Sequence, residues 1–431
     1  MTTNALTLAP IRAVSGEVNL PGSKSLSNRA LLLAALAHGE TSLNNLLFSD
    51  DTARMMTALT QLGIHCEFDE IAKRCNVVGG GGPFQTSGKS FDLQLGNAGT
   101  AVRPLVAMLA LSPGDFKIDG DHYMRARPIG DLTDALVARG VPVEYLDRKG
   151  YLPLTLRGGH LTGGAVRLKG SLSSQYLTAL LMALPLASES SSIDIEGDLV
   201  SKPYIDMTLA MMAKFGVIAT HDRYQQFQIA GGQQYQTPGD LLVEGDASTA
   251  SYFLAAGALR GEITVTGVGH ESLQGDVAFA AVLQQMGAEV SIEADRISVK
   301  STGALAAIDA DLNHIPDAAM TVAILALFAE GTSTIRNIYN WRIKETDRMT
   351  AMANELTKVG ASVSTTDDSI RITPPKHIRC ANIKTYGDHR MAMCFSLLAF
   401  GAEGIVISNP EVTQKTFPRY FEVFDTIATP V

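Results

Sequence analysis

The segment WRIKETDRM, residues 341–349, places cations beside a carboxylate in a pattern that suits acid–base chemistry. We expect it to open a helix on which Lys344 and Arg348 stand four residues apart and repel each other. Burial and the two cations can tune the pKa of Glu345, which would make it a general acid or base. The alternative is an exposed first helical turn held by salt bridges.

The segment GSKSLSNR, residues 22–29, places Lys24 and Arg29 at the expected start of another helix. It is not a phosphate-binding P-loop, because Ser23 rather than glycine precedes the lysine. Cations at a helix start oppose the helix dipole at a cost of about 0.3–1 kcal/mol each. Their presence indicates a bound anion, with solvated surface charges as the alternative.

Three more segments have the composition of anion sites. In GNAGTAVRP, residues 96–104, glycines allow backbone N–H groups to approach a ligand closely, although the turn can also be purely structural. In HYMRARP we expect an extended strand on which Arg125 and Arg127 face the same way, or an ordinary exposed strand. GSLSSQYL, residues 170–177, holds more hydroxyls than helix capping alone requires.

Two acidic turns complete the set of polar helix starts. GDHRMAM contains Asp388, His389 and Arg390, and HIPDAAM contains Asp317. An Asp at such a position ordinarily serves as an N-cap, and a lone His there is ordinarily structural. Lys415, in QKTFPRYF, is predicted to be a surface charge.

These turns belong to one pattern that recurs six times: a strand, a tight turn, a run of small apolar helix formers, and another strand. The turns centre, at intervals of 71 to 75 residues, on Gly22, Gly96, Gly170, Gly245, Pro316 and Gly387. A second helix in each of five repeats is expected to end before a left-handed glycine, namely Gly63, Gly140, Gly216, Gly287 and Gly360. We therefore expect three repeats in each of two domains, with the break near residue 240, and the polar turns can converge if the repeats are arranged with pseudo-symmetry.

Composition limits the classes of function. The chain has 431 residues, only 18% of them charged, and a net charge of −9, which argues against binding nucleic acid or anionic lipid through its overall surface. The four cysteines show no spacing typical of a disulfide framework or a metal site, so we expect buried, reduced thiols. The N-terminus lacks the features of a signal peptide and no apolar run is long enough to span a bilayer, which predicts a soluble, cytoplasmic protein.

Eight motifs closely resemble those of the 5-enolpyruvylshikimate-3-phosphate (EPSP) synthase family: LPGSKSLSNRALLLAALA, GNAGTAVRPL, KGSLSSQYLTALLM, SKPYIDMT, IPDAAMT, YNWRIKETDRM, YGDHRMAM and KTFPRYF. The resemblance runs from about residue 10 to 425. It implies a shikimate-pathway transferase that moves the enolpyruvyl group of phosphoenolpyruvate to the 5-hydroxyl of shikimate 3-phosphate, without metal or organic cofactor. It also implies an α/β fold of the α+β type, with two similar domains of three βαβαββ repeats that close on a cleft. The domains would be 24–242, mainly for shikimate 3-phosphate, and 1–23 plus 243–431, which supplies the catalytic carboxylates and part of the phosphoenolpyruvate site. The enzyme is expected to be a monomer.

The resemblance also implies ligand contacts, residue by residue. Shikimate 3-phosphate would be bound by Lys24, Ser25, Arg29, Ser173, Ser174, Gln175, Ser201, Tyr204, Asp317, Asn340 and Lys344. Phosphoenolpyruvate would be bound by Lys24, Asn97, Gly99, Arg127, Gln175, Arg348, Arg390 and Lys415, with Arg103, Asp246, Glu345, Asp388 and His389 close by.

The implied catalytic residues are Asp317, Glu345 and Lys24. Asp317 would take the proton of the 5-hydroxyl and Glu345 would protonate the methylene carbon, while Lys24 stabilises the tetrahedral intermediate and can share the role of Glu345. The two substrates together carry a charge of roughly −5 to −6, which the eight proposed cations can balance. Glyphosate is expected to bind at the phosphoenolpyruvate site, and the presence of Gly99 and Pro104 predicts a sensitive enzyme.

We considered two alternative functions. A related enolpyruvyl transferase acts on UDP-N-acetylglucosamine and carries a cysteine shortly before an A-R-P segment, but the matching stretch here, DGDHYMRARP, contains none. A non-catalytic ring of repeats that clamps nucleic acid would need basic residues over its whole inner surface, and the net charge has the wrong sign.

Overall fold

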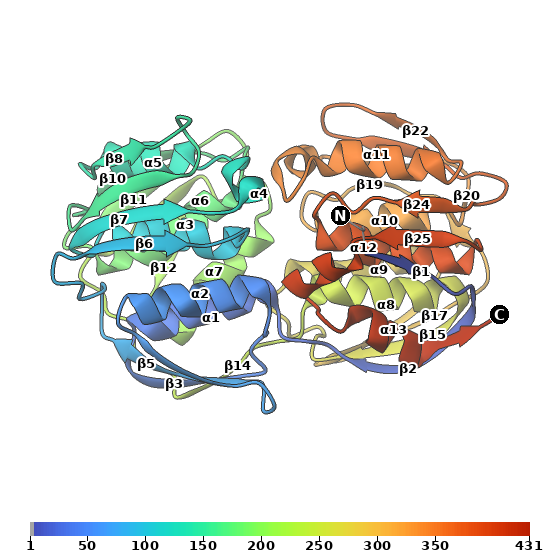
Figure 1. The fold of residues 1–431 in the computed structure, drawn as a ribbon, viewed down its shortest axis with the longest axis horizontal. Helices are drawn as coiled ribbons and strands as arrows, with labels where there is room; N and C mark the ends of the chain where they lie inside the picture. Colours follow the sequence, from blue (N-terminus) through green and yellow to red (C-terminus); the bar gives the residue numbers. More distant parts are fainter. Residues whose placement is uncertain (1–3) are drawn as a thin grey trace. The chain divides into compact units, whose positions relative to one another are not determined.

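The computed structural model describes residues 4–431, which divide into two compact units. We call Gly22–Val243 the central unit, and Met1–Pro21 with Glu244–Val431 the terminal unit. These boundaries lie within two residues of the expected domain limits. Strands and helices alternate throughout both units, which confirms the expected mixed α/β class (Figure 1).

The central unit contains three four-stranded sheets of the same topology. In each sheet the first two strands pair in parallel and the other two are antiparallel to their neighbours. The sheets, in spatial order, are β14(Asp240–Leu242)-β3(His38–Asn44)-β5(Arg74–Gly80)-β4(His65–Asp69), β6(Ser90–Gln94)-β7(Gly114–Asp119)-β9(Leu154–Gly158)-β8(Val143–Tyr145) and β10(Gly164–Lys169)-β11(Ser191–Glu196)-β13(Gln226–Ile229)-β12(Ala219–Asp222). The helices are α1(Lys24–Leu36), α2(Asp50–Gln61), α3(Gly99–Leu109), α4(His122–Arg125), α5(Gly130–Val137), α6(Ser174–Ala183) and α7(Pro203–Lys214), with the 3₁₀ turn η1(Leu184–Leu186).

The terminal unit repeats this arrangement with more variation. Its sheets are β16(Glu289–Ile292)-β17(Arg296–Lys300)-β15(Gly261–Thr266)-β2(Ile11–Asn19)-β26(Ala428–Pro430), β19(Asp309–Asp311)-β21(Ser333–Arg336)-β23(Ile370–Thr373)-β22(Ser362–Thr365), β1(Ala5–Thr7)-β25(Ile405–Ser408)-β24(Ala381–Ile383) and β18(Leu305–Ala306)-β20(Ala329–Glu330). The helices are α8(Ala247–Arg260), α9(Phe279–Gln285), α10(Ala319–Leu325), α11(Arg348–Lys358), α12(His389–Phe395) and α13(Tyr420–Ile427). Four 3₁₀ segments join them: η2(Gly275–Ala278), η3(Tyr339–Ile343), η4(Ser396–Phe400) and η5(Pro410–Lys415).

Two strands pair outside the repeat to which their sequence position assigns them. Strand β2 leads into the turn at Gly22, yet it pairs in parallel with β15 of the terminal unit. Strand β14 leads into the turn at Gly245, yet it pairs in parallel with β3 of the central unit. The chain passes between the units directly after each of these strands, so each unit receives one strand from the neighbouring stretch of sequence.

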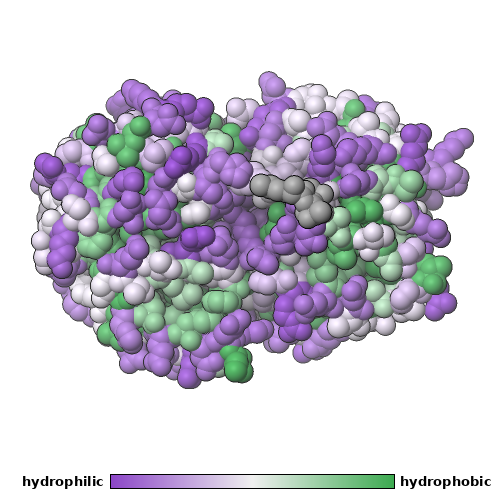
Figure 2. Space-filling model, viewed as in Figure 1, coloured by the Kyte–Doolittle hydropathy of each residue, from purple (hydrophilic) through white to green (hydrophobic). Residues whose placement is uncertain are grey.

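The helices that follow the repeated turns are buried along almost their whole length, whereas the second helices expose part of their surface. In α1 the residues Leu31 to Leu36 are fully buried, and α8 is buried along almost its whole length. Sheet strands alternate instead, as in β10, where Val166 and Leu168 point inward between more exposed neighbours. Figure 2 shows hydrophilic side chains over most of the face in view, with apolar residues in scattered patches.

The five glycines expected after the second helices all have positive φ, from 80° to 101°. This confirms their predicted role as left-handed caps. The expectation for the cysteines is only partly right, because Cys75 and Cys394 are buried whereas Cys66 is half-buried and Cys380 is exposed. Cys380 lies in the loop just before β24, where no packing covers it.

No helix of residues 4–431 is both long and apolar enough to cross a membrane. Over the same residues, no group of three or more His, Cys, Asp or Glu side chains is placed to hold a metal ion.

Candidate active site

Lys24 and Arg29, two of the predicted cations of the central unit, lie in the first two turns of α1. Lys24 is the first residue of α1, behind the N-cap Ser23, and it is only 6% exposed. Its Nζ lies 3.8 Å from Oδ2 of Asp51 on α2. Thr100, at the start of α3, also donates to this carboxylate and accepts from Asn28 of α1. The starts of α1, α2 and α3 therefore come together around one buried lysine.

Arg29 lies one turn further along α1 and is buried among neutral oxygens. Its Nε donates to Thr208 Oγ1 at 2.9 Å, and its other nitrogens donate to Thr178 Oγ1 and to the carbonyls of Ser25 and Tyr204. Burial lowers the pKa of Arg29 from 12.5 to about 10, so it stays cationic at neutral pH. A buried cation in such surroundings is not a solvated surface charge, and an anionic ligand would stabilise it.

The glycine-rich turn before α3 meets two arginines. Arg103 Nη1 donates to Gln175 Oε1 at 2.7 Å, and Arg127 Nη1 donates to Asn97 Oδ1 at 3.3 Å. A Cβ on Gly99 would lie 2.8–2.9 Å from the guanidinium nitrogens of both arginines. All five of these predicted residues thus lie together, and glycine at position 99 leaves room for the two side chains.

The extended strand predicted for HYMRARP is wrong. Residues His122–Arg125 form the short helix α4, capped by Asp121, whose side chain accepts from Met124 N. Because of this short helix, the two arginines do not face the same way. Arg125 pairs with Asp119 and is half exposed, whereas Arg127 is buried. A local N-cap overrides the alternation that an extended segment would show.

The serine cluster lies at the start of α6. Ser173 is the N-cap, accepting from Gln175 N at 3.2 Å, and Ser174 is the first helical residue and is buried. Ser201, just before α7, is buried with a left-handed φ of 55°. Tyr204, in the first turn of α7, supplies the carbonyl that accepts from Arg29.

In the terminal unit, Arg348 holds three carboxylates. It is 1% exposed, and its Nε donates to Asp388 Oδ2 at 2.7 Å, its Nη1 to Asp317 Oδ1 at 2.8 Å and its Nη2 to Glu345 Oε2 at 2.9 Å. Burial alone would lower the pKa of Arg348, but the three carboxylates outweigh it and raise that pKa. One guanidinium thereby fixes the positions of both predicted catalytic carboxylates.

Asp317 has two further cationic partners. Arg390 Nη2 lies 2.9 Å from its Oδ2, and Lys344 Nζ lies 3.5 Å from its Oδ1. Burial would raise the pKa of Asp317, but Arg390, Lys344 and Arg348 together hold it well below its ordinary value. Asp317 is therefore a carboxylate at neutral pH.

The helix expected across WRIKETDRM starts later than predicted. Residues 339–343 form η3, Lys344 lies outside any helix, and α11 begins at Arg348 behind the N-cap Asp347. Lys344 and Arg348 are thus not a repelling pair on one helix, and both form ion pairs with Asp317. The later helix start could have been predicted from Asp347, a helix-capping residue type that stands directly before the apolar face.

The remaining predicted residues lie in the same turns. Asn340 is buried in η3, and His389 is fully buried at the start of α12, with Nδ1 3.4 Å from Asp388 Oδ1. Asp246 is the N-cap of α8, where its carboxylate accepts from Thr249 N. Lys415 is 8% exposed in η5, so its prediction as a surface charge is wrong. The segment η5 packs against α12.

Three residues beside these clusters were not singled out in the sequence. Asp51 lies near Lys24, Tyr252 accepts from Arg390 Nη1 at 3.1 Å, and Asp276 accepts from Ser248 Oγ and Ala318 N. Asp51 and Asp276 resemble ordinary acidic residues of a first helical turn, and Tyr252 lies inside an apolar helix. Only the tertiary structure shows what they contact.

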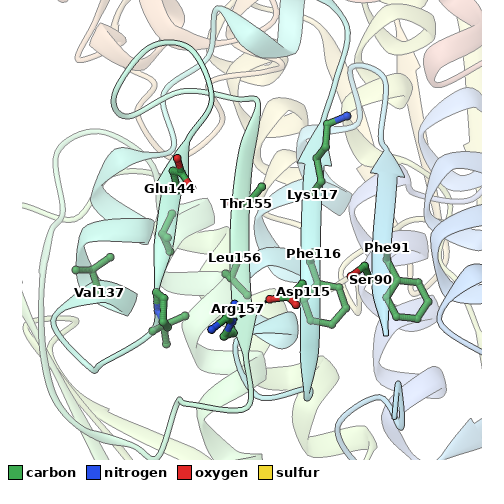
Figure 3. A pocket seen from close by; sticks show the side chains of 13 residues that line it. Ser90, Phe91, Asp115, Phe116, Lys117, Val137, Glu144, Thr155, Leu156 and Arg157 are labelled. Carbon is green, nitrogen blue, oxygen red and sulfur yellow. Dashed lines mark hydrogen bonds and ion pairs between the residues drawn. The ribbon is translucent and has the colours of Figure 1, made fainter. Parts of the chain in front are cut away.

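A surface cavity of about 670 Å³ in the central unit lies apart from these clusters. It is lined by residues of β6, β7, β8 and β9 and by the end of α5 (Figure 3). Arg157 and Asp115 form an ion pair across two of these strands. None of the predicted site residues lines it, so the chemistry is better placed at the helix starts.

The comparisons with known proteins agree with this reading. The family model described as EPSP synthase (3-phosphoshikimate 1-carboxyvinyltransferase) matches residues 8–424. The chain is 57% identical to the 3-phosphoshikimate 1-carboxyvinyltransferase of Sulfurovum sp. (strain NBC37-1) over 427 residues, covering 99% of this chain and 100% of the relative. It is also 57% identical to the protein of that name from Escherichia coli O17:K52:H18, with 99% of both chains covered.

Solved structures show the same fold. EPSP synthase from Acinetobacter baumannii matches with a TM-score of 0.81 at 24% identity, covering 99% of this chain and 98% of the other. The enolpyruvyl transferase NikO from Streptomyces tendae matches with a TM-score of 0.78 at 18% identity over the same shares. Given the match of the family model and the 57% identical relatives, the chain belongs to the EPSP synthase (3-phosphoshikimate 1-carboxyvinyltransferase) family.

Proposed function

We propose that the protein performs the reaction of its family through the residues at its helix starts. The protein is a transferase of the shikimate pathway, which moves the carboxyvinyl group of phosphoenolpyruvate to the 5-hydroxyl of shikimate 3-phosphate. Inorganic phosphate is the second product. What we add is the assignment of individual side chains to the steps of this reaction.

The assignment of side chains to the reaction rests on the positions of the buried cations. Among the described residues, the buried lysines and arginines are Lys24, Arg29, Arg103, Arg127, Arg348, Arg390 and Lys415. Each is a residue that the motifs assign to the substrates or place beside them. Burying a cation is costly unless an anion compensates it, and the two substrates bring roughly six negative charges.

The charges differ between the units in a way that suits different tasks. In the terminal unit Lys344, Arg348 and Arg390 lie against the carboxylates of Asp317, Glu345 and Asp388, which balances cations with anions. In the central unit Arg29 lies among neutral oxygens. We assign substrate anions mainly to the central unit's cations and proton transfer to the terminal unit's carboxylates.

Proton transfer begins when Glu345, in its protonated form, delivers a proton to the methylene carbon of phosphoenolpyruvate and makes the adjacent carbon electrophilic. Asp317, held ionised by its three cations, accepts the proton of the attacking 5-hydroxyl. Lys24, Arg127 and Arg390 stabilise the tetrahedral intermediate electrostatically. Glu345, now ionised, takes back a methyl proton as phosphate leaves with the proton held by Asp317, and the double bond is restored. Lys24 can share the proton transfer with Glu345.

Binding of the substrates is assigned in the same way. Ser173, Ser174 and Gln175 at the start of α6 offer hydroxyl, amide and backbone donors to the phosphate of shikimate 3-phosphate. Arg127, Arg390 and Lys415 bind phosphoenolpyruvate, and glyphosate competes for the same groups. We also propose that the enzyme works as a monomer in the cytoplasm.

The acceptor provides the test. Purified protein is incubated with phosphoenolpyruvate and either shikimate 3-phosphate or UDP-N-acetylglucosamine, and the carboxyvinyl product is identified by NMR. We expect product only with shikimate 3-phosphate. Product only with the nucleotide sugar, or none with either acceptor, would overturn the proposal.

A further inference from the structure

Glu355 is a fully buried carboxylate that the reaction does not use. It lies on α11, seven residues after Arg348, and its side chain has no exposed surface. Tyr386 OH donates to its Oε1 at 2.7 Å, Lys384 N donates to its Oε2 at 3.1 Å, and Lys358 Nζ lies 2.6 Å from Oε2. Hydrogen bonds to an ionised group are stronger than neutral ones, so this carboxylate anchors residues 384 and 386 to α11.

The anchored segment has a strained backbone. Tyr386 has a φ of 54°, and Gly387 follows with a φ of 70°. A left-handed conformation costs a non-glycine residue about 1–2 kcal/mol, and it persists where surrounding contacts determine it. The hydrogen bond from the Tyr386 phenol to Glu355 supplies such a contact. Thr385 adds another, because its hydroxyl donates to the Ser408 carbonyl at 2.9 Å.

The next residues belong to the candidate active site. Asp388 caps α12 and accepts from Arg348, and Arg390 lies against Asp317. Helix α11 therefore contacts this loop at two points: Arg348 at its start holds Asp388, and Glu355 about 10 Å along the helix holds Lys384 and Tyr386. Two contacts fix both the position and the direction of a loop, where one would leave it free to pivot.

We propose that Glu355 and Tyr386 are positioning residues that hold the 384–388 loop so that Asp388 and Arg390 reach Arg348 and Asp317. This inference rests on the proposed function, because it gives Arg390 its role toward phosphoenolpyruvate. Neither residue touches the reacting atoms in this assignment. Their effect passes through the backbone of the loop.

The test compares Tyr386→Phe with a matched control, Tyr224→Phe. Tyr224 also has a left-handed φ, of 61°, and its phenol also donates to a carboxylate, Asp206 Oδ1 at 2.8 Å, but at an exposed turn of the central unit. We expect Tyr386→Phe to raise the KM for phosphoenolpyruvate about tenfold and leave the KM for shikimate 3-phosphate within about twofold. Tyr224→Phe should change neither.

Variants of Glu355 separate positioning from simple stability. Glu355→Gln keeps one acceptor oxygen, which can serve Tyr386 or Lys384 but not both in their present places, so it should recover only part of the phosphoenolpyruvate affinity that Glu355→Ala loses. If Glu355→Ala does not fold, Tyr386→Phe decides alone. An unchanged KM for phosphoenolpyruvate in folded Tyr386→Phe would overturn the inference, even if its melting temperature falls.

Hydrogen exchange distinguishes failure of this inference from failure of the proposed function. In ligand-free protein, amides 384–391 should exchange faster in Tyr386→Phe than in wild type, and should be unchanged in Tyr224→Phe. If wild type makes no product from shikimate 3-phosphate, the proposed function fails, and the exchange result alone decides whether Tyr386 holds the loop. Equal exchange in all three proteins would refute the holding role.

Discussion

Arg348 shows how a single side chain can organise an active site. Its five N–H donors form a planar fork, and Asp317, Glu345 and Asp388 occupy three sides of it. A lysine would offer one charged point and fewer fixed directions, so Arg348→Lys is not a conservative change here. The arginine is buried, which keeps the three carboxylates at fixed distances from one another.

Gly99 provides a prediction about space. In Gly99→Ala the new methyl would lie 2.8–2.9 Å from guanidinium nitrogens of Arg103 and Arg127, which is closer than such atoms approach. The arginines must shift, so we expect a raised KM for phosphoenolpyruvate and weaker inhibition by glyphosate. Inhibition assays with both proteins check this, and a glyphosate inhibition constant no tighter for wild type than for the variant would contradict it.

Asp276 provides a prediction about pH. Burial, together with the charges of Asp317 and Asp246, raises its pKa from 3.8 to about 6, although Arg390 opposes the rise. The folded state therefore binds this proton more tightly than the unfolded state does. Its stabilising effect is complete below about pH 4 and is lost as pH rises through about 6, by up to about 3 kcal/mol.

Asp276→Asn removes this titration. Denaturant unfolding of both proteins from pH 5 to 7.5 should show the wild type losing stability relative to the variant as pH rises. The comparison cancels the titrating groups that do not interact with Asp276. A constant difference across this range would show that Asp276 does not titrate there.

At the scale of elements, the repeated turn and helix start is what places the chemistry. Ser23, Ser173, Asp246 and Asp388 each cap a helix with a side-chain acceptor, and the predicted ligand residues follow in the first turn. Backbone N–H groups and the helix dipole at such ends favour anions. The six sequence repeats thus provide six similar places for polar side chains.

The repeats could be predicted from the sequence because glycine positions and apolar periodicity are local signals. The left-handed glycines after the second helices are found as expected. The burial of Lys415 could not be predicted in this way, because it depends on tertiary packing around η5 that no local pattern encodes. The pairing of β2 with β15 and of β14 with β3 was likewise not visible in the repeats, because strand pairing depends on partners far away in sequence.

Gly140 tests the cap at the end of α5. Its φ is 84°, and a Cβ there would meet nothing within 4 Å, so Gly140→Ala would strain only the backbone. We expect a loss of about 1 kcal/mol in the free energy of unfolding, measured by urea titration, with turnover unchanged. Gly140→Asn should lose less, because asparagine tolerates this conformation better. Equal stability of the alanine variant and wild type would contradict the cap.

At the scale of the whole molecule, charge is scarce and its placement is specific. The chain carries a net charge of −9, yet its buried lysines and arginines, within the described part of the chain, all fall in or beside the predicted site. Under the proposed assignment, a negative protein can bind substrates with roughly five to six negative charges, because buried cations are reserved for them. The same scarcity made these residues conspicuous in the sequence.

The most direct test is phosphate release from phosphoenolpyruvate, measured with and without shikimate 3-phosphate in wild type, Asp317→Asn and Glu345→Gln. Wild type should release phosphate only when both substrates are present. The variants should still bind both substrates, measured by calorimetry, but release phosphate at least about a hundredfold more slowly. Release that ignores shikimate 3-phosphate, or near-normal release in both variants, would contradict the account.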